Sequence, residues 1–187
     1  MVTLREVSNG IYGAWRLARL DAGAMTWFDR SARGVWRSFW AMALAYPGFL
    51  VLLALHPTPN QSWFLPSLPT AIVESIGYVI GWTALPLIVF EIWHWFRREE
   101  QALDFIVAYN WAQLLQILPS IAIALMASAL TPTLAMALNA TLWVALIAYE
   151  WFIARIALRA SGLVTTAVVL LDQVLGMGLG EVAQSLY

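Results

Sequence analysis

The chain contains no cysteine and no lysine, and charged residues of any kind are few. Without cysteine it has no disulfide, no thiol nucleophile, no iron–sulfur cluster and no thiolate zinc site. Of its 187 residues, 11% are charged and 61% are hydrophobic, whereas soluble domains are roughly 25% charged. This composition predicts a membrane protein with little chain left over for a soluble domain.

The common motifs of nucleotide binding and hydrolysis are also missing: G-x-x-x-x-G-K-[ST], G-x-G-x-x-G, H-E-x-x-H and G-x-S-x-G. Gly176, Gly178 and Gly180 lie within an apolar segment without a preceding strand, so they indicate close helix packing rather than a phosphate loop. We therefore expect no enzymatic activity, no cofactor and no nucleic-acid partner.

Five apolar runs are long enough for a helix to cross a membrane, at about residues 38–55, 71–93, 105–127, 134–154 and 163–179. The sequence therefore predicts an all-α, polytopic membrane protein with five transmembrane helices preceded by amphipathic interfacial helices. Residues 1–37 are expected to form a cytoplasmic amino-terminal segment, and residues 38–187 the membrane domain.

Two short segments before the first span carry arginines on one helical face, in residues 11–20 and 25–39. Both patterns predict helices that lie along a membrane surface. We expect five side chains to bind anionic lipid headgroups, namely Arg16, Arg19, Arg30, Arg33 and Arg37. Two alternatives stay open. The first segment could be a frayed polar tail, because Gly13 lies within it, and the arginines could only anchor and orient the first span.

The positions of the ten basic residues, all arginine, predict the topology. Six precede the first span, two lie between the second and third spans, and two between the fourth and fifth. Residues 56–70 carry no charged residue and four prolines, as in a translocated loop. By the positive-inside rule the amino terminus is cytoplasmic and the carboxyl terminus lies outside. Arginine without lysine indicates GC-rich coding and hence a bacterium, so we expect the inner membrane and a periplasmic carboxyl terminus.

The third predicted span carries a narrow stripe of polar side chains that lipid cannot satisfy. The other spans are therefore expected to surround this helix, with Asp172 at a similar depth. We predict an intramembrane polar site, either binding or structural, formed by Tyr109, Asn110, Gln113, Gln116, Asp172 and Gln173. Asp172 is either protonated and bonded to Gln113 or Gln116 as a link between helices, or it belongs to a proton or substrate site.

Glu91 and His94 have the E-x-x-H spacing that supplies two ligands in di-metal helical bundles. The sequence has no second pair of this kind, so an ion pair at the membrane interface is expected instead of a metal site. The predicted interfacial charge cluster consists of Glu91, His94, Arg97, Arg98, Glu150 and Arg155.

Two stretches, WRSFWAMALAYPGF (36–49) and AYNWAQLLQILPS (108–120), lie in a five-span layout with a polar amino-terminal segment. Over residues 31–180 this layout resembles the Yip family of Rab-GTPase-interacting five-span membrane proteins, and particularly its small bacterial relatives of unassigned function. The resemblance implies a bundle of short spans that organises membrane partners, and it supplies no site residue.

The function that follows is a non-enzymatic integral membrane protein that organises lipid or protein partners. Its expected partners are membrane lipids with anionic headgroups, together with other membrane proteins or a second copy of the chain. Two alternatives are a small-solute or proton transporter that uses the mid-membrane polar site, and an accessory subunit of a larger membrane complex.

Overall fold

The structure is a computed structural model that describes residues 2–55 and 66–186. Throughout these ranges the regular structure is helical, with no strand. The elements are α1 Leu4–Ala18, the 3-10 helix η1 Ala22–Trp27, α2 Ala32–Ser38, α3 Trp40–Leu55, α4 Leu68–Trp95, α5 Glu99–Ser128, α6 Pro132–Ala157 and α7 Gly162–Ser185. Five helices are long and apolar enough to span a membrane, the first being α2 and α3 together. The prediction of an all-α, multi-pass membrane protein is confirmed.

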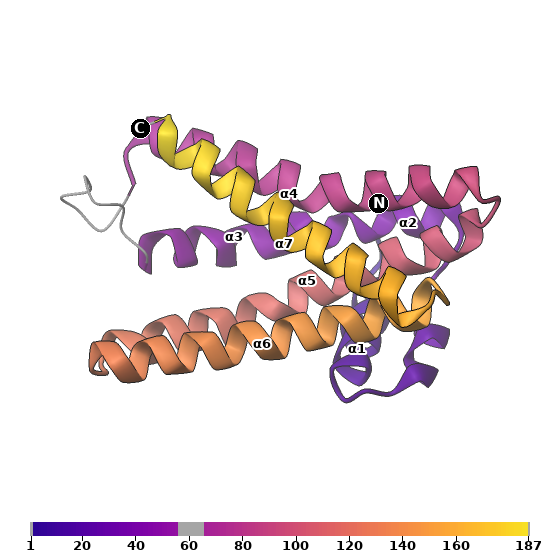
Figure 1. The fold of residues 1–187 in the computed structure, drawn as a ribbon, viewed down its shortest axis with the longest axis horizontal. Helices are drawn as coiled ribbons and strands as arrows, with labels where there is room; N and C mark the ends of the chain where they lie inside the picture. The colour runs from indigo at the N-terminus through magenta and orange to yellow at the C-terminus, as the bar shows by residue number, and fades with distance from the viewer. Residues whose placement is uncertain (1, 56–65, 187) are drawn as a thin grey trace.

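Short turns make the last four spans run antiparallel to one another along the chain (Figure 1). Ser161 caps α7 through the backbone N–H of Val164, and Pro132 occupies the first turn of α6. At the other ends of the helices, Arg97 follows α4 and Arg159 follows α6 in the left-handed conformation, with φ of 56° and 47°. This conformation ends a helix and reverses the chain.

The helix α5 is the centre of the bundle. It packs against α1, α2, α3, α4 and α6, while α7 completes the bundle against α4 and α6. Every residue from 104 to 112 is buried. The prediction that the polar third span lies at the centre is therefore confirmed.

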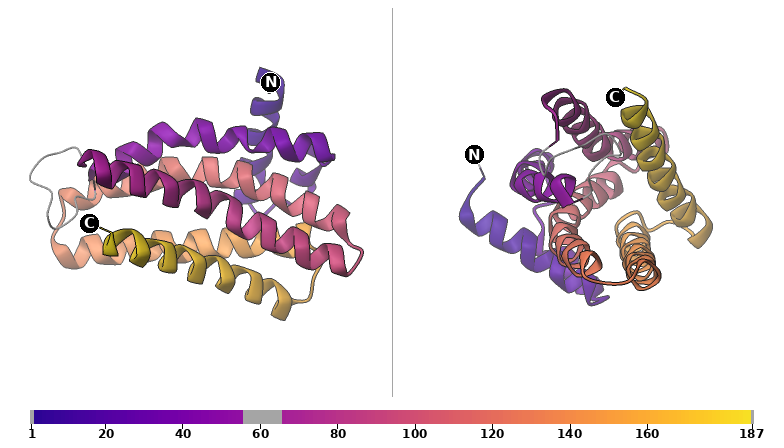
Figure 2. Two further views of the ribbon diagram at one scale, coloured as in Figure 1. Left: turned by 90° about the horizontal axis from the view of Figure 1, so that it is seen from above. Right: turned by 90° about the vertical axis from the view of Figure 1, so that its left-hand side faces the viewer.

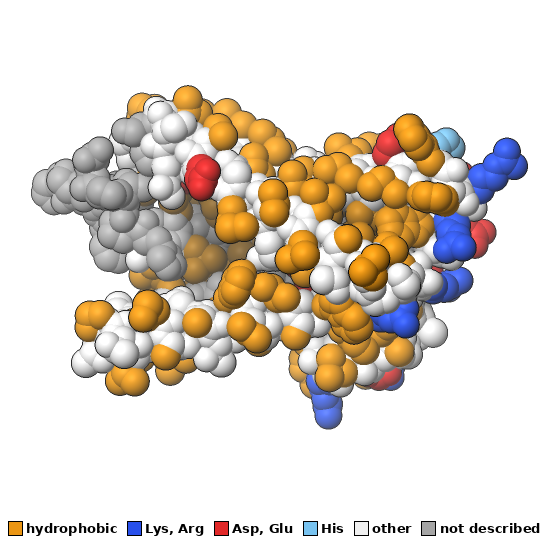
Figure 3. Space-filling model, in the orientation of Figure 1, with side chains coloured by type: hydrophobic (Ala, Val, Ile, Leu, Met, Phe, Trp, Pro, Cys, Tyr) orange, Lys and Arg blue, Asp and Glu red, His pale blue; other side chains and the backbone are white. Residues whose placement is uncertain are grey.

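The arginine side chains gather at one end of the molecule, which we call the arginine end (Figure 3). It comprises α1, η1, α2, the α4–α5 turn and the α6–α7 turn. Here α1 runs across the spans rather than along them (Figure 2). A helix in this position lies in the plane of the membrane when the spans cross it.

Two predicted features of the amino-terminal segment are wrong. The first helix begins at Leu4, because Thr3 and Glu6 form a capping box in which the Thr3 N–H donates to Glu6 Oε2 at 2.7 Å. Residues 25–39 do not form one helix. Arg30 lies in the extended break between η1 and α2, so it does not share a helical face with the arginines of α2.

The contacts of α1 with the bundle depend on residues without large side chains. A Cβ at Gly10 would lie 2.3 Å from the Trp111 ring, and one at Gly13 would lie 2.7 Å from the Phe28 ring. The Tyr149 hydroxyl donates to the carbonyl of Ala14 at 2.7 Å. The alternative of a frayed polar tail is therefore wrong for α1, which is docked on α5 and α6.

The late glycines do not provide the close helix packing predicted for them. A Cβ at Gly176, Gly178 or Gly180 would meet no neighbouring atom of the described residues within 4 Å. These positions face outward because α7 uses other residues, such as Val168 and Val169, to contact the bundle.

Candidate functional site

The predicted intramembrane site begins with a hydrogen bond between α5 and α7. The Tyr109 hydroxyl donates to Asp172 Oδ1 at 2.9 Å. Tyr109 is fully buried because it projects from the central helix, and Asp172 is half-buried. Each lies about 15 Å from the arginine end of its own helix, at 1.5 Å per residue. The two predicted residues therefore meet at the same depth.

A second carboxyl group, that of Glu150 on α6, joins them. Glu150 is only 6% exposed, accepts a hydrogen bond from Gln173 Nε2 at 3.3 Å, and is a hydrogen-bonding neighbour of the Asp172 carboxyl. Its predicted place in the interfacial charge cluster is wrong. Glu150 lies about 10 Å inside the end of α6 and faces α7 rather than the turn.

The remaining predicted residues separate into two groups. Gln173 accepts a hydrogen bond from Trp143 Nε1 at 3.1 Å, and Gln113 is a hydrogen-bonding neighbour of the Tyr109 hydroxyl. Asn110 lies apart, since its amide donates to Ser38 Oγ of α2 at 2.8 Å. At Gln116 it is the backbone carbonyl that accepts a bond, from the Ser120 hydroxyl.

The predicted bond between Asp172 and a glutamine of α5 is therefore wrong, because Tyr109 and Glu150 take that place. We call Tyr109, Glu150, Asp172 and Gln173 the carboxyl cluster. It offers two carboxyl groups, a phenol and an amide. In the part of the chain that the structure describes, no group of three or more histidine, cysteine, aspartate or glutamate side chains could hold a metal ion.

Asp104 organises a second polar arrangement, which the sequence analysis missed. Its Oδ2 accepts from Arg30 at 3.1 Å and from Arg159 at 3.2 Å, and the carboxylate is 8% exposed. The available signal was its position, as the last charged residue before the long apolar run of α5. It joins the segment before α2 and the α6–α7 turn to the central helix.

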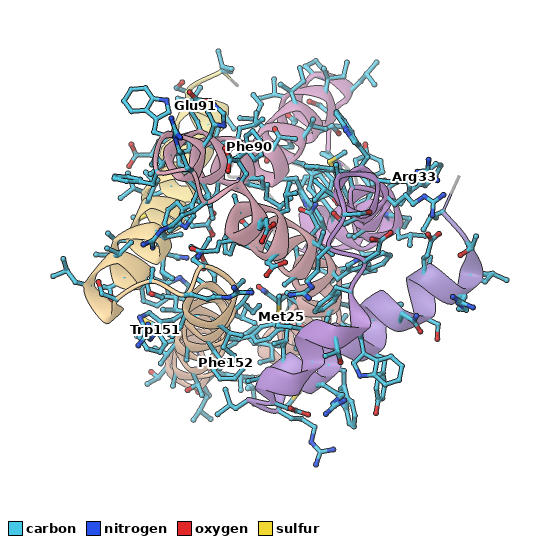
Figure 4. All side chains as sticks on the ribbon, turned by 90° about the vertical axis from the view of Figure 1, so that its right-hand side faces the viewer. Met25, Arg33, Phe90, Glu91, Trp151 and Phe152 are labelled. Atoms are coloured by element: carbon cyan, nitrogen blue, oxygen red, sulfur yellow. The ribbon has the colours of Figure 1, made fainter. Side chains whose placement is uncertain are left out.

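Three of the five arginines predicted to bind headgroups form ion pairs within the chain: Arg16 with Asp21, Arg30 with Asp104, and Arg37 with Glu6. Their charge is already compensated, which weakens them as headgroup ligands. Arg19 instead stacks on Trp15 at 4.8 Å, and Arg33 points outward from the rim of the arginine end (Figure 4). The expected headgroup contact therefore stays a prediction mainly for Arg19 and Arg33.

The predicted interfacial charge cluster does not form as one unit. His94 Nδ1 pairs with Glu99 Oε1 at 3.0 Å, and Glu91 accepts from Trp95 Nε1 at 2.8 Å. Arg155 donates to the carbonyl of Ala160. The predicted ion pairing of Glu91 and His94 with Arg97, Arg98 or Arg155 is therefore replaced by contacts with Trp95 and Glu99.

We expect acid to loosen α1. The pKa of Glu6 lies below its ordinary value of 4.5, chiefly because its carboxylate accepts the Thr3 backbone N–H, and also because of the Thr3 hydroxyl and Arg37. A carboxyl whose pKa is lowered by folding stabilises the fold above its unfolded pKa, and this contribution is lost as pH falls through the folded pKa. In detergent, the thermal midpoint of wild type should fall below about pH 4.5 more steeply than that of Glu6→Gln, while Glu100→Gln should follow wild type. Parallel curves for wild type and Glu6→Gln would contradict this.

The geometry thus presents two polar features: the carboxyl cluster inside the bundle and a set of ion pairs at the arginine end. No protein-family model, no curated protein and no solved structure matches this chain.

Proposed function

We propose that this multi-pass membrane protein organises lipids at the cytoplasmic leaflet of a bacterial inner membrane, as a non-enzymatic, Yip-like protein. The observation that carries the proposal is the docked helix α1. With all ten arginines at one end, the positive-inside rule makes the arginine end cytoplasmic. The carboxyl terminus, at the opposite end of α7, then lies in the periplasm.

The faces of α1 fit an in-plane membrane helix. At about 100° per residue, Leu4, Ile11 and Trp15 form one edge, which is apolar and exposed. Arg5, Asn9 and Arg16 form a second edge about 120° further around the helix. The third face, with its glycines and Leu17, contacts the bundle. An apolar edge beside a polar edge is the arrangement of a helix that lies at the headgroup boundary.

The apolar edge does not end at α1. Together with Val7 and Tyr12 it lines a shallow apolar groove that continues to Leu115 on α5. Leu115 lies one turn, about 6 Å, further along α5 than Trp111, which α1 contacts at Gly10. The groove therefore borders α1 on its apolar edge, and an acyl chain is its natural occupant. Because α1 is fixed to α5, it would hold lipid in a set position relative to the spans.

Arg19 and Arg33 are the side chains expected to add selectivity for anionic headgroups. Each basic side chain near the surface contributes about 1 kcal/mol to the attraction for anionic lipid. The double variant Arg19→Gln, Arg33→Gln should therefore lose about 2 kcal/mol, roughly a 30-fold drop in the affinity of the full chain for added phosphatidylserine or cardiolipin. The affinity can be measured by native mass spectrometry from neutral detergent micelles, and salt should weaken it.

The matched control is Arg97→Gln with Arg98→Gln. It removes the same charge from the same end of the molecule, but at the α4–α5 turn. If both double variants lose affinity equally, binding follows overall charge and not the α1–α2 region. If neither loses affinity, the proposed headgroup role of Arg19 and Arg33 is wrong.

A further inference from the structure

The carboxyl cluster brings two acidic side chains together from separate spans. Glu150 comes from α6 and Asp172 from α7, and their carboxyl groups are hydrogen-bonding neighbours. The Tyr109 hydroxyl of α5 donates to Asp172, and the Gln173 amide donates to Glu150 Oε2. Trp143 orients this amide, because the Trp143 N–H donates a hydrogen bond to Gln173 Oε1.

Two carboxylates cannot hydrogen-bond to each other, because each only accepts. A hydrogen bond between Glu150 and Asp172 therefore requires a proton on one of them. Glu150 Oε1 is buried and receives no hydrogen bond from the described residues. A proton on Glu150 makes this carboxyl a donor to Asp172, whose own charge is stabilised by the Tyr109 hydroxyl.

Within residues 2–55 and 66–186, no positively charged side chain forms an ion pair with Glu150 or Asp172. The titratable or charged groups that face the pair are Tyr109 from α5 and the two carboxyls themselves, on α6 and α7. Among the described residues, the ion pairs of arginine and histidine involve other carboxylates. Of those ion-paired carboxylates, Asp104 is the one on α5 nearest to Tyr109. It lies five residues before Tyr109, about 7.5 Å along the helix axis.

We propose that Glu150 and Asp172 form a proton-binding site at the contact between α6 and α7, in which the two carboxyl groups hold one proton between them. The site goes beyond the lipid-organising role and does not depend on it. Its ligand is a hydrogen ion, because the orphaned oxygen of Glu150 and the Asp172 carboxylate are satisfied together by one proton.

Release of the proton changes the contact between the two helices. Two carboxylates side by side repel each other, and this repulsion is strong inside a membrane. Outside the two carboxyls, α6 and α7 are joined by hydrogen bonds from Trp143 to Gln173 and from Trp151 to Thr166. Loss of the proton would therefore weaken the contact between α6 and α7.

The test is infrared spectroscopy of the full chain in lipid nanodiscs, with the C=O stretching band of a protonated carboxylic acid as the readout. Wild type should show this band at neutral pH, with the small shift expected in heavy water, and should lose it as pH rises. Glu150→Gln should lack the band at neutral pH. Asp172→Asn should shift its frequency, because the acceptor of the acid proton changes from a carboxylate to an amide.

The control is Glu181→Gln, an exposed acid near the end of the same helix α7, which should retain the wild-type band. A wild-type spectrum with no protonated carboxyl at neutral pH would overturn the proposal. So would a band that keeps its position and intensity in both Glu150→Gln and Asp172→Asn. If Glu150→Gln fails to fold, the band position in Asp172→Asn decides, since an unchanged position excludes Asp172 as the partner.

Discussion

Replacing Gly10 by valine should detach α1 from the bundle and lower the free energy of unfolding by about 3 kcal/mol, the upper range for overpacking a buried contact. A Cβ at Gly10 would lie 2.3 Å from the Trp111 indole, which is itself only 4% exposed. The clashing atoms belong to the rigid fused ring and not to the end of a flexible side chain, so the ring or the helix must shift at a cost. Equilibrium unfolding in detergent, followed by tryptophan fluorescence, measures the loss.

Two further variants make this result specific. Gly178→Val places the same side chain on α7, where a Cβ meets nothing within 4 Å, and it should leave stability nearly unchanged. Combining Gly10→Val with Trp111→Ala should destabilise by less than the sum of the single changes, since the smaller side chain removes the clash. Equal effects of Gly10→Val and Gly178→Val would show that α1 is not held at this contact.

The second large effect is expected from Asp104→Leu. This substitution leaves Arg30 and Arg159 facing each other without their shared carboxylate. Removing one partner of a fully buried ion pair costs about 3 to 5 kcal/mol. Here both arginine side chains are about half exposed, at 44% and 61%, and water compensates their charges in part. We therefore expect a loss of about 2 kcal/mol in the same unfolding measurement.

The control for Asp104→Leu is Glu100→Leu, which removes an exposed acid one turn earlier on α5 and should cost less than about 0.5 kcal/mol. Arg30→Gln with Arg159→Gln should cost at least as much as Asp104→Leu, because it leaves the buried Asp104 carboxylate without a counter-charge. A loss for Asp104→Leu no larger than that of Glu100→Leu would contradict the role of Asp104 as the link among the three segments.

The spans were predictable from the sequence because a helix that crosses lipid needs a fixed length of apolar residues, whatever its neighbours are. The central place of α5 was predictable for a related reason. Its polar side chains need partners, and only a central helix meets partners on most of its faces. The start of α1 was predicted wrongly, at residue 11, although Thr-Leu-Arg-Glu at residues 3–6 has the pattern of a capping box.

The polar partners were not predictable from the sequence. Asp104 meets arginines 74 and 55 residues away, and neither spacing has any local signature. Glu150 was assigned to the interface because it lies near the end of a span. The direction in which its side chain points depends on how α6 and α7 pack. The periodicity of the sequence shows which residues share a face of one helix. Which face of one helix packs against which face of another depends on the assembled bundle.

The in-plane position of α1, with its apolar edge in lipid, is the central claim and can be tested with a spin label. Because the chain has no cysteine, Ile11→Cys and Arg5→Cys each provide a single labelling site. In nanodiscs, power-saturation measurements should find the label at residue 11 accessible to oxygen and protected from a water-soluble nickel complex, with the reverse at residue 5. Equal access of the nickel complex to both labels would contradict the claim.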